Sequence, residues 1–280
     1  MRILVTGGSG YLGTHIRRFF NADDFSRRSN LNILDDNDVQ LISSYDVIIH
    51  LAAHLDKSPA AAVECFRVNA AGTANVLRAA PQGAVLIYAS SKDVYGTHAD
   101  AYDEVPEECS VEFCGQTALE WSKLIGEHYV HYYTEQRNLR SCVFRLSTVY
   151  ARPSEGNEYG FVTHYVESVK RRWPIRVPLE GKPVRDILHV DDLSRACQAF
   201  IASGRRQGIY NLGGGGGNSA SLSEIIKTVG RLIEIEPEIA ADPTLPHPVP
   251  VNYVSDLRRV RNELGWMPQI GIEEGLRSLL

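Results

Sequence analysis

The feature that most constrains this chain is a glycine-rich turn close to its N-terminus. A short apolar run over residues 2–6 is followed by GGSGYLG at 7–13, and residues 11–20 have helical apolar spacing. Between a buried strand and a helix, glycines allow a tight turn and bring the backbone close to a pyrophosphate. The helix N-terminus offers free N–H groups and a partial positive charge to the phosphates. The turn therefore predicts a dinucleotide site that includes Gly7, Gly10, Tyr11, Leu12 and Gly13.

Strand and helix patterns alternate through the first half of the chain. Short apolar runs at 46–52, 84–90 and 141–147 are separated by helical spacing at 60–80 and 116–135. Continuous apolar strands between helices predict a parallel sheet that is covered on both faces. We therefore expect an α/β fold with a doubly wound parallel sheet. The segment 25–34 is too polar for a strand to be assigned within it.

The second half of the chain has a different pattern, because prolines at 153, 174, 178 and 183 divide it into short segments. Helices are expected at 191–202, 221–232, 255–264 and 272–280, and a strand at 208–212. We predict that residues 1–150 form a dinucleotide-binding domain to which 186–212 return. Residues 151–185 and 213–280 are then expected to form a smaller C-terminal substrate-binding lobe.

Composition excludes several classes of protein. The 280 residues carry 29 Lys and Arg against 34 Asp and Glu, so a net charge of −5 offers no basic field for nucleic acid. Five scattered cysteines without a CxxC pair argue against a disulfide framework or a zinc cluster and favour a reducing compartment. No apolar run approaches the roughly 18 residues of a membrane span. We expect a cytoplasmic protein that binds no metal, nucleic acid or membrane.

The type of dinucleotide depends on residues about twenty positions after the glycine turn, where an acidic residue binds the ribose of NAD and an arginine accommodates the 2′-phosphate of NADP. Counting from Gly7 reaches Arg27 and Arg28, with Asp23 and Asp24 just before them. Arg27 favours NADP over NAD. A solvated loop that happens to carry two arginines is the alternative interpretation.

Further motifs follow the glycine turn in order along the chain: HLAA at 50–53, NAAGT at 69–73, SSKDVYG at 90–96, SKLIGE at 122–127, RLSTVY at 145–150, RDILHVDD at 185–192, YNLG at 210–213 and ELGWMP at 263–268. Together with TGGSGYLG at 6–13, they resemble the extended short-chain dehydrogenase/reductases. This is the NAD(P)-dependent epimerase/dehydratase group that acts on nucleotide sugars. The resemblance covers essentially the whole chain. It implies a Rossmann fold, an NAD or NADP cofactor and a nucleotide-diphosphate sugar as substrate.

The resemblance also implies roles for individual residues. Ser91 would hydrogen-bond the reacting sugar oxygen, and Lys123 would hold the hydroxyls of the nicotinamide ribose. Arg185 would bind the nucleotide diphosphate, since a guanidinium suits a bidentate phosphate contact; a surface ion pair with Asp186 is the alternative. The other residues expected to contact cofactor or substrate are Leu51, Ala52, Ala53, Asn69 and Thr148.

Lys92 and Asp93 lie where the dehydratase branch of the family carries an acidic pair. Asp93 could act as an acid or a base, whereas Lys92 breaks the pair, which disfavours a 4,6-dehydratase. Lys92 is therefore expected to contact substrate instead. A solvated loop is the alternative for both residues.

One position departs from the family pattern. The family places a tyrosine four residues before the helix lysine, so that both side chains share one helix face and the ammonium lowers the pKa of the phenol. Here Lys123 is present, but Leu119 occupies the tyrosine position. A second Tyr-x-x-x-Lys pattern, Tyr88 to Lys92, straddles a strand end and is not interpreted as the catalytic pair. The residues close enough to substitute are Cys114, Thr117 and Glu120, for which structural roles are favoured.

Two functions fit these observations. The first is an NAD(P)-dependent nucleotide-sugar epimerase or ketoreductase with an atypical proton relay. Epimerisation must first remove a proton, whereas ketoreduction needs one proton that water could deliver, so the absence of the tyrosine affects epimerisation more. The alternative is a non-catalytic protein that binds a dinucleotide or a sugar nucleotide on the same fold. A third interpretation is that Leu119 is itself an engineered substitution in an otherwise ordinary enzyme.

The long helices at 60–80 and 116–135 resemble the pair that forms a four-helix dimer interface in this family. An aromatic outer face on the second helix, formed by His128, Tyr129, Tyr132 and Tyr133, fits that role. We therefore expect a homodimer, although the same aromatic residues could belong to an ordinary core.

Overall fold

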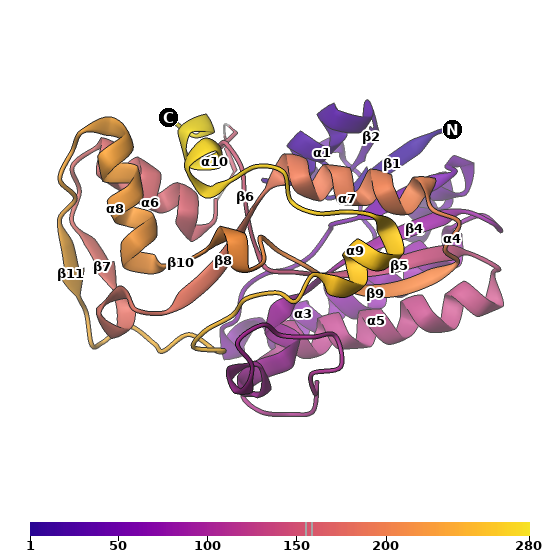
Figure 1. Ribbon diagram of the computed structural model, residues 1–280. Coiled ribbons are helices and arrows are strands. Elements are labelled where there is room, and N and C mark those ends of the chain that lie inside the picture. Colours follow the sequence, from indigo (N-terminus) through magenta and orange to yellow (C-terminus); the bar gives the residue numbers. More distant parts are fainter. Residues whose placement is uncertain (155, 158) are drawn as a thin grey trace.

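The computed structural model describes residues 1–154, 156–157 and 159–280. Its main sheet has six parallel strands in the order β2-β1-β3-β4-β5-β9 (Figure 1). These strands are β1 (Ile3–Thr6), β2 (Asp23–Phe25), β3 (Val47–His50), β4 (Val85–Ser91), β5 (Arg140–Leu146) and β9 (Gln207–Leu212). The strand order reverses between β1 and β3, which is where ligands bind in open α/β sheets. The predicted doubly wound α/β fold is confirmed.

Helices cover both faces of this sheet because the side chains of each strand alternate between them. On one face, Val5 and Ile49 share a core with α1 (Gly13–Phe20) and α7 (Val190–Ala202). On the other, Leu4 and Ile48 share a core with α4 (Thr73–Ala79) and α5 (Ala118–Gln136). Figure 1 shows α7 above the sheet and α5 below it. The continuous apolar runs in the sequence therefore correspond to strands that are buried on both sides.

The edge strand β2 ends where the unassigned segment 25–34 begins, and Phe25 is the only residue that the two share. It has only three residues, and its register is set by pairing with β1, with Phe25 opposite Thr6. The chain then forms a 3₁₀ turn at Arg27–Ser29, α2 (Asp36–Gln40) and a second 3₁₀ turn at Leu41–Ser44. Because pairing with β1 rather than local apolar periodicity defines β2, no sequence pattern marked it.

The expected single helix over 60–80 is wrong in one respect. A 3₁₀ turn at Pro59–Ala61 and α3 (Ala62–Cys65) lead into a π-helical stretch, η4 (Phe66–Gly72), before α4 begins. A Cβ on Gly72 would lie 2.6 Å from Ile33 Cδ1, so the stretch packs closely against the loop that follows β2. Such π-helical turns often occur at functional sites. Here the widened turn includes Asn69, one of the predicted site residues.

The second half of the chain forms a smaller body beside the main sheet. A three-stranded sheet in the order β10-β8-β6 and a two-stranded sheet of β11 and β7 pack with three helices around one apolar core. The strands are β6 (Thr148–Tyr150), β7 (Ile175–Val177), β8 (Val184–His189), β10 (Ser219–Ser221) and β11 (Ile239–Ala241); the helices are α6 (Phe161–Lys170), α8 (Leu222–Ile233) and α10 (Ile272–Ser278). The chain returns to the main sheet through α7 and β9.

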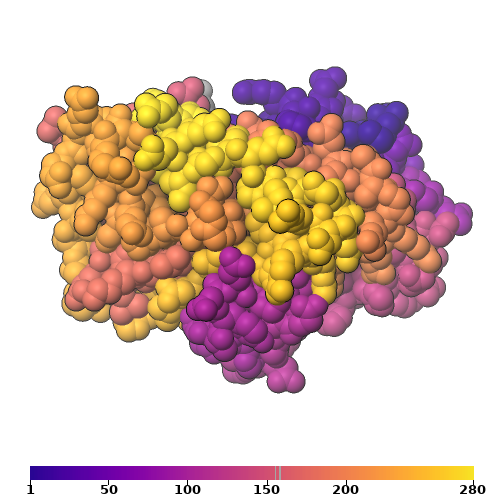
Figure 2. Space-filling view, viewed as in Figure 1, coloured from indigo at the N-terminus to yellow at the C-terminus, as the bar shows by residue number. Residues whose placement is uncertain are grey.

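The C-terminal segment connects the two bodies. Helix α9 (Arg258–Leu264) packs against β9, and α10 packs against α8. Between them, the Asp192 carboxylate accepts hydrogen bonds from the backbone N–H groups of Gln269 and Ile270, each at 2.9 Å. Figure 2 shows this segment, in yellow, running across the face of the molecule from the centre toward the smaller body. Asp192 therefore fixes the path of the C-terminal segment.

All five cysteines are free thiols. Among the described residues, no helix combines the length and the apolar character that crossing a membrane requires.

Candidate active site

The glycine turn lies at the carboxyl end of β1, directly against the loop that follows β3. Gly7 has φ +69°, and a Cβ there would lie 2.9 Å from the Ala52 backbone nitrogen. A Cβ on Gly13 would overlap the Gly7 carbonyl oxygen. The turn and the loop therefore approach each other backbone to backbone. This leaves the start of α1 without side chains that would keep a phosphate away, so the residues present fit a dinucleotide.

A buried histidine holds the loop after β3 in place. Thr6 Oγ1 lies 2.6 Å from His50 Nδ1, and His50 Nε2 lies 2.9 Å from Thr73 Oγ1. Burial lowers the pKa of His50 to about 3, so the ring is neutral near pH 7. The Ala52 N–H also donates to Thr6 Oγ1 at 3.2 Å. These contacts set residues 51–53 beside the glycine turn.

Two further predicted cofactor residues connect elements around the turn. The Asn69 side chain accepts from the His54 N–H at 2.7 Å and donates to Ser122 Oγ at 2.9 Å, which ties the loop after β3 to α5. The Tyr11 hydroxyl donates to the Ala151 carbonyl at 2.8 Å. Asn69 and Tyr11 thus hold the rim of the site, while Leu12 packs against the core on the α7 face.

Strand β2 and the residues that follow it bring one acidic group, Asp24, to the glycine turn. Asp24 Oδ2 accepts from the hydroxyls of Ser9 and Ser26, whereas its Oδ1 is buried without a hydrogen-bond partner among the described residues. Arg28 donates to the Ser9 carbonyl at 3.1 Å, and Arg27 is exposed. An orphaned buried acceptor at this position fits a ribose hydroxyl. In the sequence, Asp24 stands just before the two arginines, and no motif assigns it to the site.

Ser91 is the last residue of β4, the strand that lies beside β3 in the main sheet. Its Oγ accepts from the Asp93 N–H at 3.1 Å, and no described residue accepts a hydrogen bond from its hydroxyl. The Asp93 carboxylate pairs with the Lys92 ammonium and with Lys57 Nζ, the latter at 2.6 Å. Burial alone would raise the pKa of Asp93, but the two lysines hold it well below its usual range. Asp93 is therefore a carboxylate near pH 7.

Lys123 lies on α5 beneath this turn and is only 4% exposed. Its Nζ donates to the Ala89 carbonyl at 2.7 Å and lies 5.1 Å from the centre of the Tyr88 ring. Burial lowers the pKa of Lys123 to about 8. The Tyr88 hydroxyl donates a hydrogen bond to the Lys123 carbonyl at 3.3 Å, whereas the Lys92 ammonium forms an ion pair with Asp93. Tyr88 and Lys92 therefore do not form a pair.

Leu119 lies in the first turn of α5 and is 7% exposed, packed against Ala61 and Cys65. Thr117 and Glu120 form the capping box of this helix, in which Glu120 Oε2 accepts from the Thr117 N–H at 2.7 Å. The other nearby candidate, Cys114, donates its thiol hydrogen to a backbone carbonyl in the 3₁₀ segment after β4. All three groups that could substitute for a phenol are engaged in local structure.

A buried ion pair behind the serine turn was not assigned to the site from sequence. Glu127 and Arg145 side chains are 6% and 7% exposed, and Arg145 Nη2 lies 2.7 Å from Glu127 Oε2. Glu127 Oε1 accepts from Ser90 Oγ at 2.5 Å, and Arg145 Nη1 donates to the Tyr95 hydroxyl at 3.0 Å. The pair joins α5, β4 and β5 directly behind Ser91. Glu127 ends the SKLIGE motif and Arg145 begins the RLSTVY motif, so their places in these motifs were the sequence signal that could have assigned them to the site.

The predicted diphosphate ligand Arg185 is 6% exposed in β8. Its guanidinium donates to the carbonyls of Val184 and Val251 at 2.7 Å and of Pro250 at 2.8 Å. A phosphate contact would therefore have to replace some of these hydrogen bonds. Thr148 lies beside Ile187 where β6 pairs with β8.

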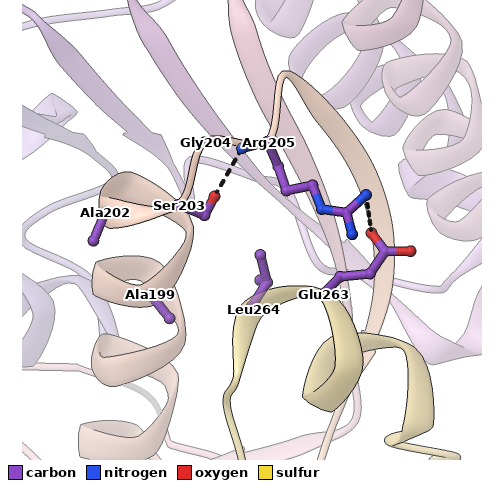
Figure 3. Close-up of a pocket in the computed structure, with 7 residues that line it drawn as sticks. All are labelled: Ala199, Ala202, Ser203, Gly204, Arg205, Glu263 and Leu264. Carbon is purple, nitrogen blue, oxygen red and sulfur yellow. Dashed lines mark hydrogen bonds and ion pairs between the residues drawn. The ribbon is translucent and has the colours of Figure 1, made fainter.

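A surface pocket lies away from all these residues. Figure 3 shows it between the end of α7 and α9, with Arg205 Nη1 3.5 Å from Glu263 Oε2. Ser203 and Arg205 precede β9, so the pocket lies near the amino end of that strand. Ligands in open α/β sheets bind at the carboxyl ends, and none of the predicted site residues lines this pocket. Among the described residues, no cluster of three or more His, Cys, Asp or Glu side chains is suited to a metal ion.

Comparison with known proteins agrees with this geometry. The model of the NAD dependent epimerase/dehydratase family matches residues 3–213. The chain is 26% identical over 334 residues to CDP-paratose 2-epimerase of Salmonella typhi, which covers 100% of this chain and 98% of that protein. It is 26% identical over 327 residues to dTDP-glucose 4,6-dehydratase of Neisseria gonorrhoeae, covering 99% and 93%.

Solved structures share the fold. A UDP-glucose 4-epimerase of Thermotoga maritima with UDP-glucose superposes with a TM-score of 0.85 at 23% identity, covering 100% of this chain and 97% of that one. The RMD protein of Pseudomonas aeruginosa complexed with NADPH superposes with a TM-score of 0.84 at 22% identity, covering 100% and 98%.

Proposed function

This chain belongs to the NAD dependent epimerase/dehydratase family, and from that premise we propose that it is an NAD(P)-dependent epimerase or ketoreductase of nucleotide-diphosphate sugars with an atypical proton relay. One observation carries the proposal. The glycine turn, the loop after β3 and Ser91 meet at the carboxyl ends of three neighbouring strands, with the buried Lys123 ammonium beneath them. We assign residues 1–150 and 186–212 to cofactor binding and the remainder to substrate binding.

At the cofactor end, the backbone of the glycine turn holds the pyrophosphate, and Lys123 holds the nicotinamide ribose. When bound, the nicotinamide supplies or accepts the hydride. Lys123 Nζ donates one N–H to the Ala89 carbonyl, and an ammonium has two more N–H groups to donate. Because its pKa is about 8, most of the Lys123 population remains charged at pH 7.

At the substrate end, Ser91 polarises the reacting oxygen. Its Oγ already accepts a hydrogen bond from the Asp93 N–H, so the lone pair is engaged and the hydroxyl hydrogen is available to a sugar oxygen. Ser91→Ala should therefore lower kcat by about 10²-fold if this hydrogen bond strengthens in the transition state. Full activity in Ser91→Ala would contradict the assigned role.

For the cofactor, we propose NADP, because Arg27 and its neighbour Arg28 stand where an arginine accommodates the 2′-phosphate. One observation favours NAD instead: the buried Asp24 Oδ1 has no hydrogen-bond partner among the described residues and could accept from a ribose hydroxyl. Titration of NADPH and NADH against native protein, Arg27→Ala and Asp24→Asn separates these effects. Arg27→Ala should weaken NADPH binding and leave NADH binding unchanged. Tighter binding of NADH than of NADPH by native protein would reverse the assignment.

The function is tested by incubating the protein with reduced or oxidised cofactor and a panel of UDP-, dTDP-, GDP- and CDP-sugars. The readouts are the absorbance of the nicotinamide cofactor and the stereochemistry of the product. Turnover supports the enzyme. The second candidate, a non-catalytic binding protein, is supported by the buried apolar Leu119. Binding of both ligands without turnover, together with turnover by Leu119→Tyr, would establish that second candidate.

We also propose that the protein forms a homodimer through α3, η4 and α5. These elements pack together and leave large apolar side chains exposed, among them Val63 at 79%, Tyr132 at 56% and Phe66 at 39%. Large exposed apolar side chains on helices that pack together are what an interface between two copies would bury. Light scattering that showed only monomer at micromolar concentration would refute the dimer.

A further inference from the structure

Lys57 joins the turn that carries Ser91 to the first turn of α5. It comes from the loop after β3, and its Nζ lies 2.6 Å from Asp93 Oδ2 and 2.8 Å from Glu120 Oε1. Asp93 belongs to the serine turn, since its N–H donates to Ser91 Oγ. Glu120 directly follows Leu119 on α5. The ammonium therefore bridges Asp93, in the turn that carries Ser91, and the helix turn that lacks a phenol.

A separate contact holds Lys57 close to that helix turn. The Cys65 thiol donates to the Asp56 carbonyl at 3.3 Å. Cys65 also packs against Leu119 in a small buried cluster with Ala61. The residue before Lys57 is thus tethered to the side chain that contacts Leu119, so the place of Lys57 beside α5 does not depend on the ion pairs alone.

The surroundings of Lys57 keep its side chain protonated near pH 7. Burial alone would lower the pKa of Lys57, but Asp93 and Glu120 raise it above its ordinary value. Lys92 approaches Asp93 from the other side but is buried over the Tyr253 ring, whereas the Lys57 side chain is 48% exposed. One N–H of Lys57 donates to Asp93 Oδ2 at 2.6 Å, and Glu120 Oε1 is an ion-pair contact at 2.8 Å. An ammonium has three N–H groups, so Lys57 can also donate to a ligand.

We propose that Lys57 is the proton donor that takes the place of the absent phenol and that it confines this enzyme to the reduction of keto-sugars carried on a nucleotide diphosphate. This inference rests on the function proposed above and deepens it. An ammonium held between two carboxylates can give a proton to a carbonyl oxygen. It cannot remove one from a sugar hydroxyl, which is the step that epimerisation needs first.

Proton transfer from Lys57 would accompany hydride transfer to the carbonyl carbon. The carbonyl π bond breaks, the carbon gains a hydride from the reduced nicotinamide, and the oxygen gains the proton of Lys57 Nζ. The ketone is reduced to an alcohol and the cofactor is oxidised. Lys57 is left as a neutral amine and regains its proton from water, which reaches the exposed half of its side chain.

The test compares Lys57→Met with Lys57→Arg in the full-length protein. Arginine keeps the positive charge between Asp93 and Glu120 but does not release its proton, so a purely structural lysine predicts near-native activity for Lys57→Arg. A proton donor predicts that both variants lose about 10²-fold or more in kcat. The probes are dTDP-4-keto-6-deoxyglucose and GDP-4-keto-6-deoxymannose with NADPH and NADH.

A second variant tests the role directly. Leu119→Tyr in the Lys57→Met background restores the family's phenol four residues before Lys123, and we expect it to recover at least about tenfold of the lost kcat. Lys182→Met is the control, because Lys182 is exposed and pairs with the equally exposed Glu180 in the smaller body. It should have native kcat.

A readout independent of turnover accompanies the kinetics. Calorimetric titration with NADPH and UDP-glucose should give Kd values within about twofold of native for Lys57→Arg, since the proton is needed in the transition state rather than for binding. Failure of native protein to bind either ligand, or binding without turnover, would refute the proposed enzyme and this inference with it. Binding and turnover by native protein with near-native kcat in Lys57→Arg would refute the inference alone.

Discussion

Removing Arg145 should destabilise the protein far more than removing an exposed arginine on the same helix–strand contact. Arg145 and Glu127 are about nine-tenths or more buried, and the guanidinium contacts both carboxylate oxygens and the Tyr95 hydroxyl. Breaking a buried ion pair from one side costs about 3–5 kcal/mol, because the partner charge is left buried and unpaired. Arg145→Met should therefore lower the free energy of unfolding by that amount, measured by urea denaturation.

The chain offers a matched control. Arg206, next to β9, pairs with Glu135, also on α5, at 2.9 Å, but these side chains are 53% and 51% exposed. Arg206→Met should cost less than about 1 kcal/mol. Glu127→Gln combined with Arg145→Met should recover part of the loss, since it removes the orphaned charge. A cost for Arg145→Met as small as that for Arg206→Met would show that the buried pair is not what holds the strand ends behind Ser91.

Three further predictions follow from the geometry. Gly13→Ala should abolish NAD(P)H binding in a fluorescence titration, because its Cβ would overlap the Gly7 carbonyl oxygen; native affinity would contradict the close approach. Burial lowers the pKa of Lys123 to about 8, so between about pH 8 and 10.4 the unfolded chain binds more protons than the folded protein does. The free energy of unfolding of the native protein should therefore rise with pH across that window relative to that of Lys123→Met. Parallel plots of stability against pH for the two proteins would refute this. Tyr132→Glu should convert the dimer to monomer in light scattering, whereas an unchanged mass would move the interface elsewhere.

The parts of the fold that sequence could predict are those that depend on local pattern. The glycine turn and the buried strands β1, β3, β4 and β5 each carry their signal within a few residues. Strand β2 carries none, because only pairing with β1 defines it. The π-helical stretch is equally invisible in the sequence, since it depends on Gly72 packing against Ile33, a contact between segments far apart in the chain.

The candidate site divides in the same way. Ser91 and Lys123 could be found because each stands in a motif whose neighbours are informative. Lys57 and Asp24 could not be assigned, because no motif surrounds either of them. Lys57 contacts Glu120 on α5, and Asp24 accepts from the Ser9 hydroxyl in the glycine turn. Neither contact is indicated by neighbouring residues in the sequence. Arg185 stood in a recognisable motif, yet the carbonyls that occupy its guanidinium come mostly from residues 250–251, which no local pattern connects to it.

The substitution at position 119 separates two tasks that the family pattern combines. In that pattern the lysine both holds the ribose and lowers the pKa of a phenol, and the phenol moves the proton. With Leu119 packed against Cys65, Lys123 has no phenol to act on, and its Nζ donates to the Ala89 carbonyl instead. Binding and proton transfer can then rest on different lysines, Lys123 and Lys57. An ordinary lysine and an ordinary phenol both hold their proton near neutral pH, with pKa values of about 10.4 and 10. A neighbouring cation lowers the pKa of a phenol so that it can also act as a base, whereas the carboxylates beside Lys57 raise its pKa and remove that second role.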